Sequence, residues 1–175
     1  MYQDLIVFLV LSFVQIVAAI ILTATALYSG LRVLDRMTTG IEEWKEIKKG
    51  NVAVGIFYSA AIICFIIFLL PRIEDILFLI SANYPIKITI LGLVFALINY
   101  IIALGFGTLI LYLSINLVDK LTTDIDEMGA LKKGNIAVAL IFSLMLLAVA
   151  VAVSFPLESL FMSLKGIEAA MIRVI

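Results

Sequence analysis

The chain has 175 residues, of which 65% are apolar and 14% are charged, and its formal net charge at pH 7 is -1. Soluble globular domains are about 45 to 50% apolar and about 25% charged, so no segment here can supply the polar exterior that water requires. The near-neutral charge also excludes nucleic acid as a partner, because phosphate binding needs a concentrated basic surface. The composition therefore predicts a protein whose solvent is the lipid bilayer.

Four uncharged apolar runs follow one another along the chain. Each is long enough to cross the hydrocarbon as a helix, which takes about 20 residues. The runs are continuous rather than alternating, which excludes a transmembrane β-barrel. We expect an all-α integral membrane protein with four transmembrane helices, at about residues 5–31, 52–70, 88–116 and 136–156.

The first run has one feature of a signal peptide, since Ala24, Thr25 and Ala26 resemble a small-residue cleavage site. The basic region that precedes such a run is missing, with Asp4 in its place. The run is also longer than the roughly 7 to 15 residues of a signal-peptide core. We expect it to remain as a membrane span.

The chain repeats itself at a shift of 84 positions. Residues 35–55 read DRMTTGIEEWKEIKKGNVAVG, residues 119–139 read DKLTTDIDEMGALKKGNIAVA, and 11 of these 21 positions are identical. Such self-similarity indicates a duplication, with a first repeat at 1–84 and a second at 85–175. Because each repeat holds two spans, both should have the same orientation, related by an axis along the membrane normal.

The repeated segment predicts a short helix in each loop. Thr39 with Glu42, and Thr123 with Asp126, have the spacing of a hydroxyl cap and an acid three residues later. The helices should end at two glycine–asparagine corners, where glycine can take a left-handed conformation and asparagine can cap the next span. The corner residues are Gly50, Asn51, Gly134 and Asn135.

Each second span is followed by a proline, Pro71 or Pro156, and then by apolar residues at helical spacing. After Pro156 the apolar residues fall on one face and the polar ones largely on the other. This pattern predicts extracytoplasmic amphipathic helices that lie in the membrane interface, the second at about 157–173.

Basic residues predict the orientation of the chain. Eight of its 12 lysines and arginines lie in the loops at 32–50 and 116–135, and the other face holds Arg72, Lys87, Lys165 and Arg173. Basic loops stay cytoplasmic. We expect both loops inside and both termini outside the cytoplasmic (inner) membrane of a prokaryote.

The duplicated pattern, from Asp-(Arg/Lys)-(Met/Leu)-Thr-Thr to Lys-Lys-Gly-Asn-(Val/Ile)-Ala-Val, resembles the YjfL-type family of small inner-membrane proteins. That family is known as domain of unknown function 350 and commonly carries two copies. One departure is Asp124, which stands where the first copy has Gly40. The resemblance implies four spans and a bacterial or archaeal cytoplasmic membrane, and it brings no established activity.

Gln15 and Asn99 occupy equivalent positions well inside the first and third spans. An amide without a partner is costly in hydrocarbon, so both are expected to face protein. They can form interhelical hydrogen bonds, or they can be a polar pair that lines a central path.

Two matching acidic and hydroxyl clusters are expected at the cytoplasmic ends of the spans, formed by Asp35, Thr38, Thr39 and by Asp119, Thr122, Thr123. Such oxygen ligands can hold a cation. Alternatively, each aspartate pairs with a neighbouring base or with backbone amides. No cofactor and no cysteine or histidine metal site are expected, because histidine is absent and the one cysteine, Cys64, lies in an apolar run.

Three functions are compatible with these residues. The protein can be a scaffold or stress-response membrane component whose cytoplasmic loops dock a protein partner, which we favour because the strongest internal identity lies in the loops. It can instead be a small oligomeric channel or transporter lined by Gln15 and Asn99. An enzyme is not expected, since no catalytic set of residues is available in the spans. Self-association into a homo-oligomer is expected in the first two cases.

Overall fold

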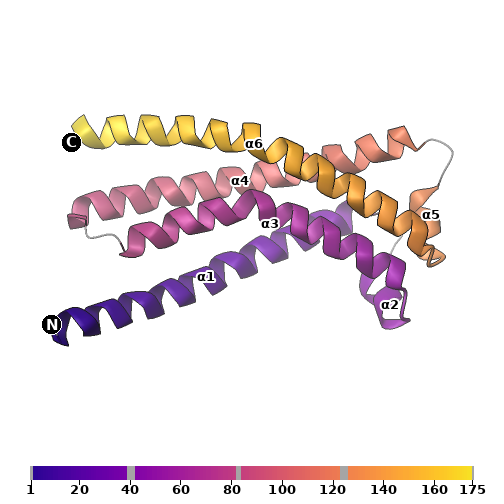
Figure 1. Ribbon diagram of the computed structural model, residues 1–175, viewed down its shortest axis with the longest axis horizontal. Helices are drawn as coiled ribbons and strands as arrows, with labels where there is room; N and C mark the ends of the chain where they lie inside the picture. The colour runs from indigo at the N-terminus through magenta and orange to yellow at the C-terminus, as the bar shows by residue number, and fades with distance from the viewer. Residues whose placement is uncertain (1, 39–41, 82–83, 123–125, 175) are drawn as a thin grey trace.

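The computed structural model describes residues 2–38, 42–81, 84–122 and 126–174, with side chains described from residue 5 to residue 166. It contains four long helices and two short ones (Figure 1). In chain order these are α1 (Tyr2–Met37), α2 (Glu43–Lys48), α3 (Val52–Ser81), α4 (Ile86–Leu121), α5 (Glu127–Lys132) and α6 (Ile136–Val174).

The four long helices are each long and apolar enough to cross a membrane. The qualifying stretches are Leu5–Met37, Val52–Ser81, Ile86–Leu121 and Ile136–Gly166. The described part of the chain contains helices and no strands. The predicted all-helical fold with four helices able to span a membrane is therefore confirmed.

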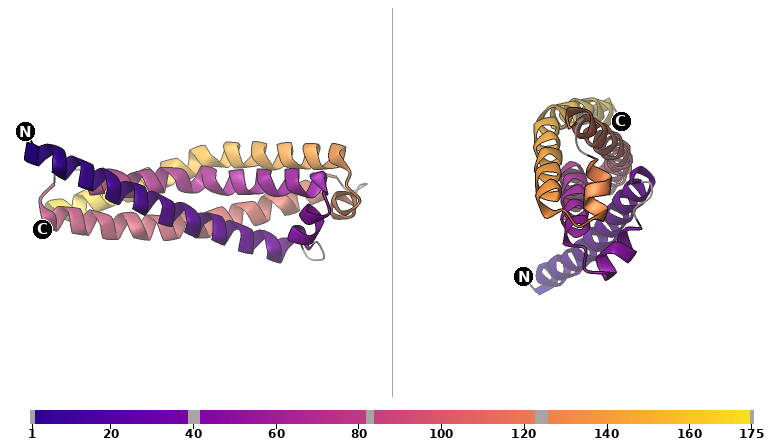
Figure 2. Two further views of the ribbon diagram at one scale, coloured as in Figure 1. Left: turned by 90° about the horizontal axis from the view of Figure 1, so that it is seen from below. Right: turned by 90° about the vertical axis from the view of Figure 1, so that its right-hand side faces the viewer.

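The long helices run between two distinct ends of the molecule. Both termini and the α3–α4 connection lie at one end, and α2 and α5 lie together at the other (Figure 1). Helix α3 is central: it packs against α1, α4 and α6, and 56% of its most apolar stretch is buried, compared with none for α1 and 28% for α4 and α6. The end-on view in Figure 2 places α3 between its neighbours.

The glycine–asparagine corners close both short helices in the same way. Gly50 and Gly134 have φ angles of 83° and 78°, as the glycine positions predict. The amides of Asn51 and Asn135 donate to the carbonyls of Glu46 and Ala130, each at 3.0 Å, which completes a Schellman motif. Each asparagine side chain then accepts a hydrogen bond from the first turn of the next long helix.

The starts of the short helices differ from the prediction. Thr39 and Thr123 lie outside the described residues, but α2 begins only at Glu43, after Glu42, which makes no side-chain cap. Helix α5 begins after Asp126, whose carboxylate accepts from the Gly129 amide at 2.9 Å. A threonine cap would start each helix about three residues earlier, so the predicted capping boxes are wrong in position.

The prolines do not end the spans. Pro71 lies inside α3 and Pro156 lies inside α6, and both helices continue well beyond them. The separate amphipathic helix predicted at 157–173 is therefore wrong. Leu157 and Phe161 are buried against other helices, so this apolar face packs on protein, which supports the helix across the missing proline hydrogen bond.

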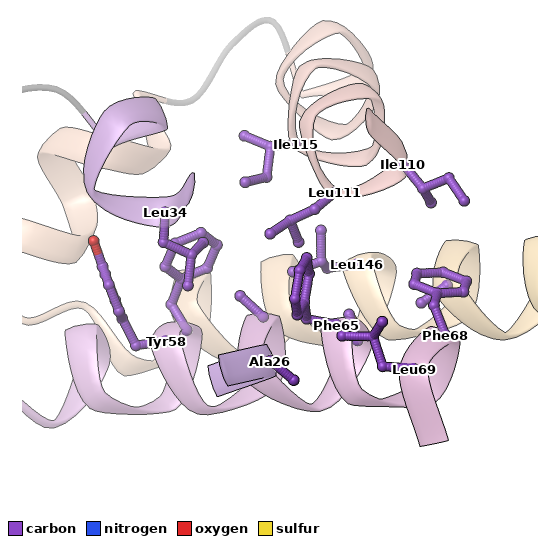
Figure 3. Packing of buried hydrophobic residues seen from close by; sticks show 14 of the residues in the cluster. Ala26, Leu34, Tyr58, Phe65, Phe68, Leu69, Ile110, Leu111, Ile115 and Leu146 are labelled. Carbon is purple, nitrogen blue, oxygen red and sulfur yellow. The ribbon is translucent and has the colours of Figure 1, made fainter. Parts of the chain in front are cut away.

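The core is filled by aromatic and branched side chains. Phe65 of α3 reaches toward Leu111 of α4, with Leu146 of α6 beside it (Figure 3). Its ring packs against the backbone of two glycines: a Cβ added to Gly30 of α1 or Gly107 of α4 would lie 3.0 or 3.2 Å from ring carbons. Small residues at these positions therefore allow α1 and α4 to approach α3 closely.

Candidate functional site

The two buried amides are not used in the same way. The side chain of Gln15 donates to the backbone carbonyl of Leu77 at 2.8 Å, which joins α1 to α3. Asn99 is buried on α4, and the described residues offer no hydrogen bond between it and Gln15. Helices α1 and α4 are joined instead through Tyr100, whose hydroxyl lies 2.8 Å from that of Thr25 and donates to the carbonyl of Leu22 at 2.7 Å.

The first acidic and hydroxyl cluster is organised around a residue that the sequence analysis did not single out. Glu43, at the start of α2, is buried, and one of its carboxylate oxygens accepts hydrogen bonds from the hydroxyls of Thr38, at 2.8 Å, and of Tyr58. The two hydroxyls are 2.6 Å apart. Asp35 lies on the exposed side of α1. This cluster therefore ties α1, α2 and α3 together.

The second cluster has the same acid but fewer donors. Glu127 of α5 is only 4% exposed, and among the described residues its Oε1 has no hydrogen-bond partner. The Thr122 hydroxyl donates to the carbonyl of Val118 at 2.8 Å, and Asp119 lies on the exposed side of α4. Burial raises the pKa of Glu127, and the nearby charge of Asp119 adds to the rise.

An ion network lies toward the other end of the molecule, between α3 and α6. Arg72 is 1% exposed, and its Nη2 donates to both carboxylate oxygens of Glu158 at 2.6 Å. Asp75 lies 3.6 Å from Nη1 of the same guanidinium and accepts from Lys165 at 2.7 Å. The ring of Phe161 covers the guanidinium, 4.5 Å from its centroid.

Arg72 and Lys165 are predicted from the basic residues to lie on the outer face, but the burial of the arginine is not predictable from that pattern. At about 1.5 Å per residue, Arg72 lies about 30 Å along α3 from Val52, which matches the thickness of the hydrocarbon core, about 30 Å. Two cations and two anions cancel here. The network is therefore a clamp between two helices in which the charges balance, while Nε and Nη1 of Arg72 make no hydrogen bond to the described residues.

The arrangement offers few groups for covalent or metal chemistry. Among the described residues, no three histidine, cysteine, aspartate or glutamate side chains gather as metal ligands. Cys64 is buried in α3.

The comparison with protein families decides what the repeat is. The family described as Domain of Unknown Function (DUF350) matches twice, over residues 7–98 and 89–172. The chain belongs to this family. The predicted family with two tandem copies is confirmed. No curated protein and no solved structure matches the chain. The boundary between residues 84 and 85 stays a prediction.

The two DUF350 copies differ in the hydrogen-bond donors that lie near their buried glutamates. Position 58 of the first copy corresponds to position 142 of the second, and the tyrosine there becomes Phe142. Phe142 stacks on Phe57 with ring centroids 5.0 Å apart, and it has no hydroxyl to offer Glu127. The acids themselves are identical in the two repeats, which was the available signal for their importance. What that identity does not reveal is which donors they meet.

Proposed function

We propose that this DUF350 protein is a structural scaffold of a prokaryotic cytoplasmic membrane, whose loop helices α2 and α5 dock a soluble cytoplasmic protein. The observation that carries the proposal is the division of the molecule into a packed apolar interior and a firmly held corner end, residues 42–51 and 126–135. The side chain of Asn51 donates to the carbonyls of Leu131 and Lys132, at 3.0 and 3.2 Å. These bonds hold α2 and α5 at a fixed separation.

The docking surface that we propose is the outer side of α2. Trp44 is 61% exposed there and Ile47 is 38% exposed. Ion pairs flank them: Lys45 with Glu42 at 3.1 Å and Lys49 with Glu46 at 2.6 Å. An aromatic anchor with a charged rim is the usual make-up of a protein-binding surface.

Site-specific photo-crosslinking in cells tests the docking. A photoreactive phenylalanine analogue in place of Trp44 should give a discrete adduct with a soluble protein, because the side chain there contacts the partner. The matched control places the same analogue at Phe155, which is 73% exposed on α6, where we expect lipid. Adducts only with lipid or with a second copy of the chain, at position 44, would reject partner docking.

The remaining parts of the proposal concern placement and assembly. We propose that the corner end is cytoplasmic, that the termini lie outside, that the protein is not an enzyme, and that several copies associate in the bilayer. None of the most apolar stretch of α1 is buried within the chain, which leaves a long face for a second copy. Native mass spectrometry from lipid nanodiscs should give the mass of a homo-oligomer.

A channel formed by an oligomer is the alternative, and it has weaker support. Gln15 is already hydrogen-bonded to a backbone carbonyl, and the centre of the chain is filled by side chains such as Phe65 (Figure 3). Flux of K⁺, Na⁺, Mg²⁺ and H⁺ into liposomes that contain the purified protein distinguishes the two functions. Selective flux that is lost in Gln15→Leu with Asn99→Leu would favour the channel.

A further inference from the structure

The acid that follows the repeated threonines is buried in both copies, but only the first copy supplies hydroxyl donors to it. Glu43 accepts from Thr38 and Tyr58. In the second copy the tyrosine is replaced by Phe142. The threonine hydroxyl bonds to the carbonyl four residues earlier in both copies, Thr38 to Leu34 and Thr122 to Val118, so the tyrosine is the donor that distinguishes them. A buried carboxylate without donors is costly, so the second copy needs another way to satisfy Glu127.

The surroundings of Glu127 offer a small space and one acidic neighbour. A small cavity of about 30 Å³ lies next to Glu127. It is lined by Val118, Thr122, Glu127, Val138, Ile141, Phe142 and Met145. A cavity of this size has room for one water-sized group, such as a hydroxyl, and its surface is almost entirely apolar. The acidic neighbour is Asp119, whose charge and hydrogen bonding add to the effect of burial in raising the pKa of Glu127.

The charges around Glu127 are of one sign. From α4 it meets Asp119, and from the start of its own helix it meets Asp126. Helix α6 presents only apolar side chains to the cavity. Helix α3 approaches α5 through Asn51, an uncharged amide. Among the described residues, no lysine or arginine forms an ion pair with Glu127.

We propose that Glu127 and Asp119 form a proton-binding site, in which one proton is shared between the two carboxyls. When the proton is bound, Glu127 donates an O–H to Asp119 and the pair carries one negative charge instead of two. Two carboxylates with no cation between them favour this form. Asp119 is exposed, so it connects the buried Glu127 to protons in water.

The first copy allows a comparison within the same chain, between Glu43 and Glu127. There the hydroxyl of Tyr58 donates to Glu43, whereas the corresponding position of the second copy holds Phe142, which carries no donor. The acid pair itself recurs in the first copy, where burial and the nearby charge of Glu43 raise the pKa of Asp35, so the two copies differ in the hydroxyl donor that the buried glutamate meets. The proton site is independent of partner docking, which rests on the exposed side of α2.

Infrared difference spectroscopy of the full chain in lipid nanodiscs, titrated with acid, tests the site. The carbonyl band of a protonated buried carboxyl should appear with a midpoint above the ordinary glutamate range, and it should shift when glutamate is labelled with ¹³C. Phe142→Tyr adds the missing donor and should lower the midpoint by on the order of one pH unit. Tyr58→Phe removes the donor in the first copy and should produce a second such band.

Glu127→Gln should abolish the original band, and Glu43→Gln should leave it in place. A band that persists in Glu127→Gln, or a midpoint that Phe142→Tyr leaves unchanged or raises, would overturn the proposal. Should Glu127→Gln fail to fold, the shift in Phe142→Tyr decides, because this substitution adds one hydroxyl next to a cavity and changes no charge.

Discussion

Gly50 and Gly134 show how a single residue type directs the chain back into the membrane. Their positive φ angles belong to the left-handed region, which costs an L-residue about 1 kcal/mol or more. Nothing lies within 4 Å of the position that a Cβ would take at Gly50. A substitution there therefore tests backbone conformation alone, without a steric clash.

We expect Gly50→Ala to lower the free energy of unfolding by about 1 kcal/mol, because alanine is strained at this φ angle. Thermal unfolding in detergent measures the change. The matched control is Gly55→Ala: Gly55 also has open space around its Cβ position, but it lies within α3 with an ordinary helical φ. The control should be neutral or slightly stabilising. Equal effects at the two positions would mean that the φ angle at the corner does not limit stability.

Glu43 and Glu127 mark the limit of what residue patterns can predict. The repeat reveals that the same acid follows the same threonines in both copies, and this much can be read from the sequence. Whether the acid is exposed as a helix cap or buried beneath the corner depends on where α2 and α5 begin. That start is decided by packing against α3 and α6, which a local capping rule does not include.

At the scale of helices, close packing around Phe65 holds three spans together. We expect Gly107→Val to destabilise the protein by about 1 to 3 kcal/mol, because its Cβ would lie 3.2 Å from the ring and the valine methyl groups closer still. Gly105→Val is the control, since Gly105 lies on the same helix with nothing within 4 Å of its Cβ position. Unfolding of both variants in the same detergent gives the comparison. A similar loss in the control would point to helix propensity instead of packing.

The continuity of α3 and α6 was not predictable from the prolines alone. A proline removes one helical hydrogen bond, and the charged residues after Pro71 and Pro156 favour an end to the span. What the sequence does not display is that Arg72 meets Glu158, 86 positions away. This contact lies between the two copies and breaks their symmetry, because Arg72 corresponds to Pro156. A search for repeated residues cannot find it.

The Arg72–Glu158 clamp gives a second prediction at this scale. Glu158→Gln leaves the guanidinium buried without its main counter-charge, and we expect a loss of about 3 kcal/mol in stability. Arg72→Met combined with Glu158→Gln should recover part of that loss, since it removes the buried charge. The control is Glu74→Gln, because Glu74 corresponds to Glu158 in the repeat but is exposed. If the loss of stability in the double variant equals the sum of the losses in Arg72→Met and Glu158→Gln measured separately, the two groups are not coupled.

At the scale of the whole molecule, the number of spans and the duplication follow from composition and self-similarity, which average over many residues. The rotation of each helix about its axis does not follow. Gln15 and Asn99 occupy equivalent positions, but one bonds to Leu77 of α3 and no bond joins the two. A rotation is fixed by a few contacts, such as Phe65 with Gly30 and Gly107, which carry little signal in a hydropathy pattern.

The orientation of the whole molecule in the membrane is the last prediction. Basic residues gather at the corner end, and of the four at the opposite end Arg72 and Lys165 are paired with carboxylates inside the protein. The positive charge that is left over from these pairs is thus concentrated at the corner end even more strongly than the count of residues suggests. Basic loops remain in the cytoplasm, so the corner end should face inside.

Cysteine accessibility checks this orientation. In a Cys64→Ala background, which has no other cysteine, Lys48→Cys on α2 should react with a membrane-impermeant maleimide only after cells are permeabilised. Tyr84→Cys, at the end of the molecule that holds the termini, should react in intact cells, because Tyr84 is 48% exposed. The reverse pattern would place the corner end outside. Partner docking in the cytoplasm would then be impossible, while the proton site at Glu127 would remain, facing the pH of the exterior.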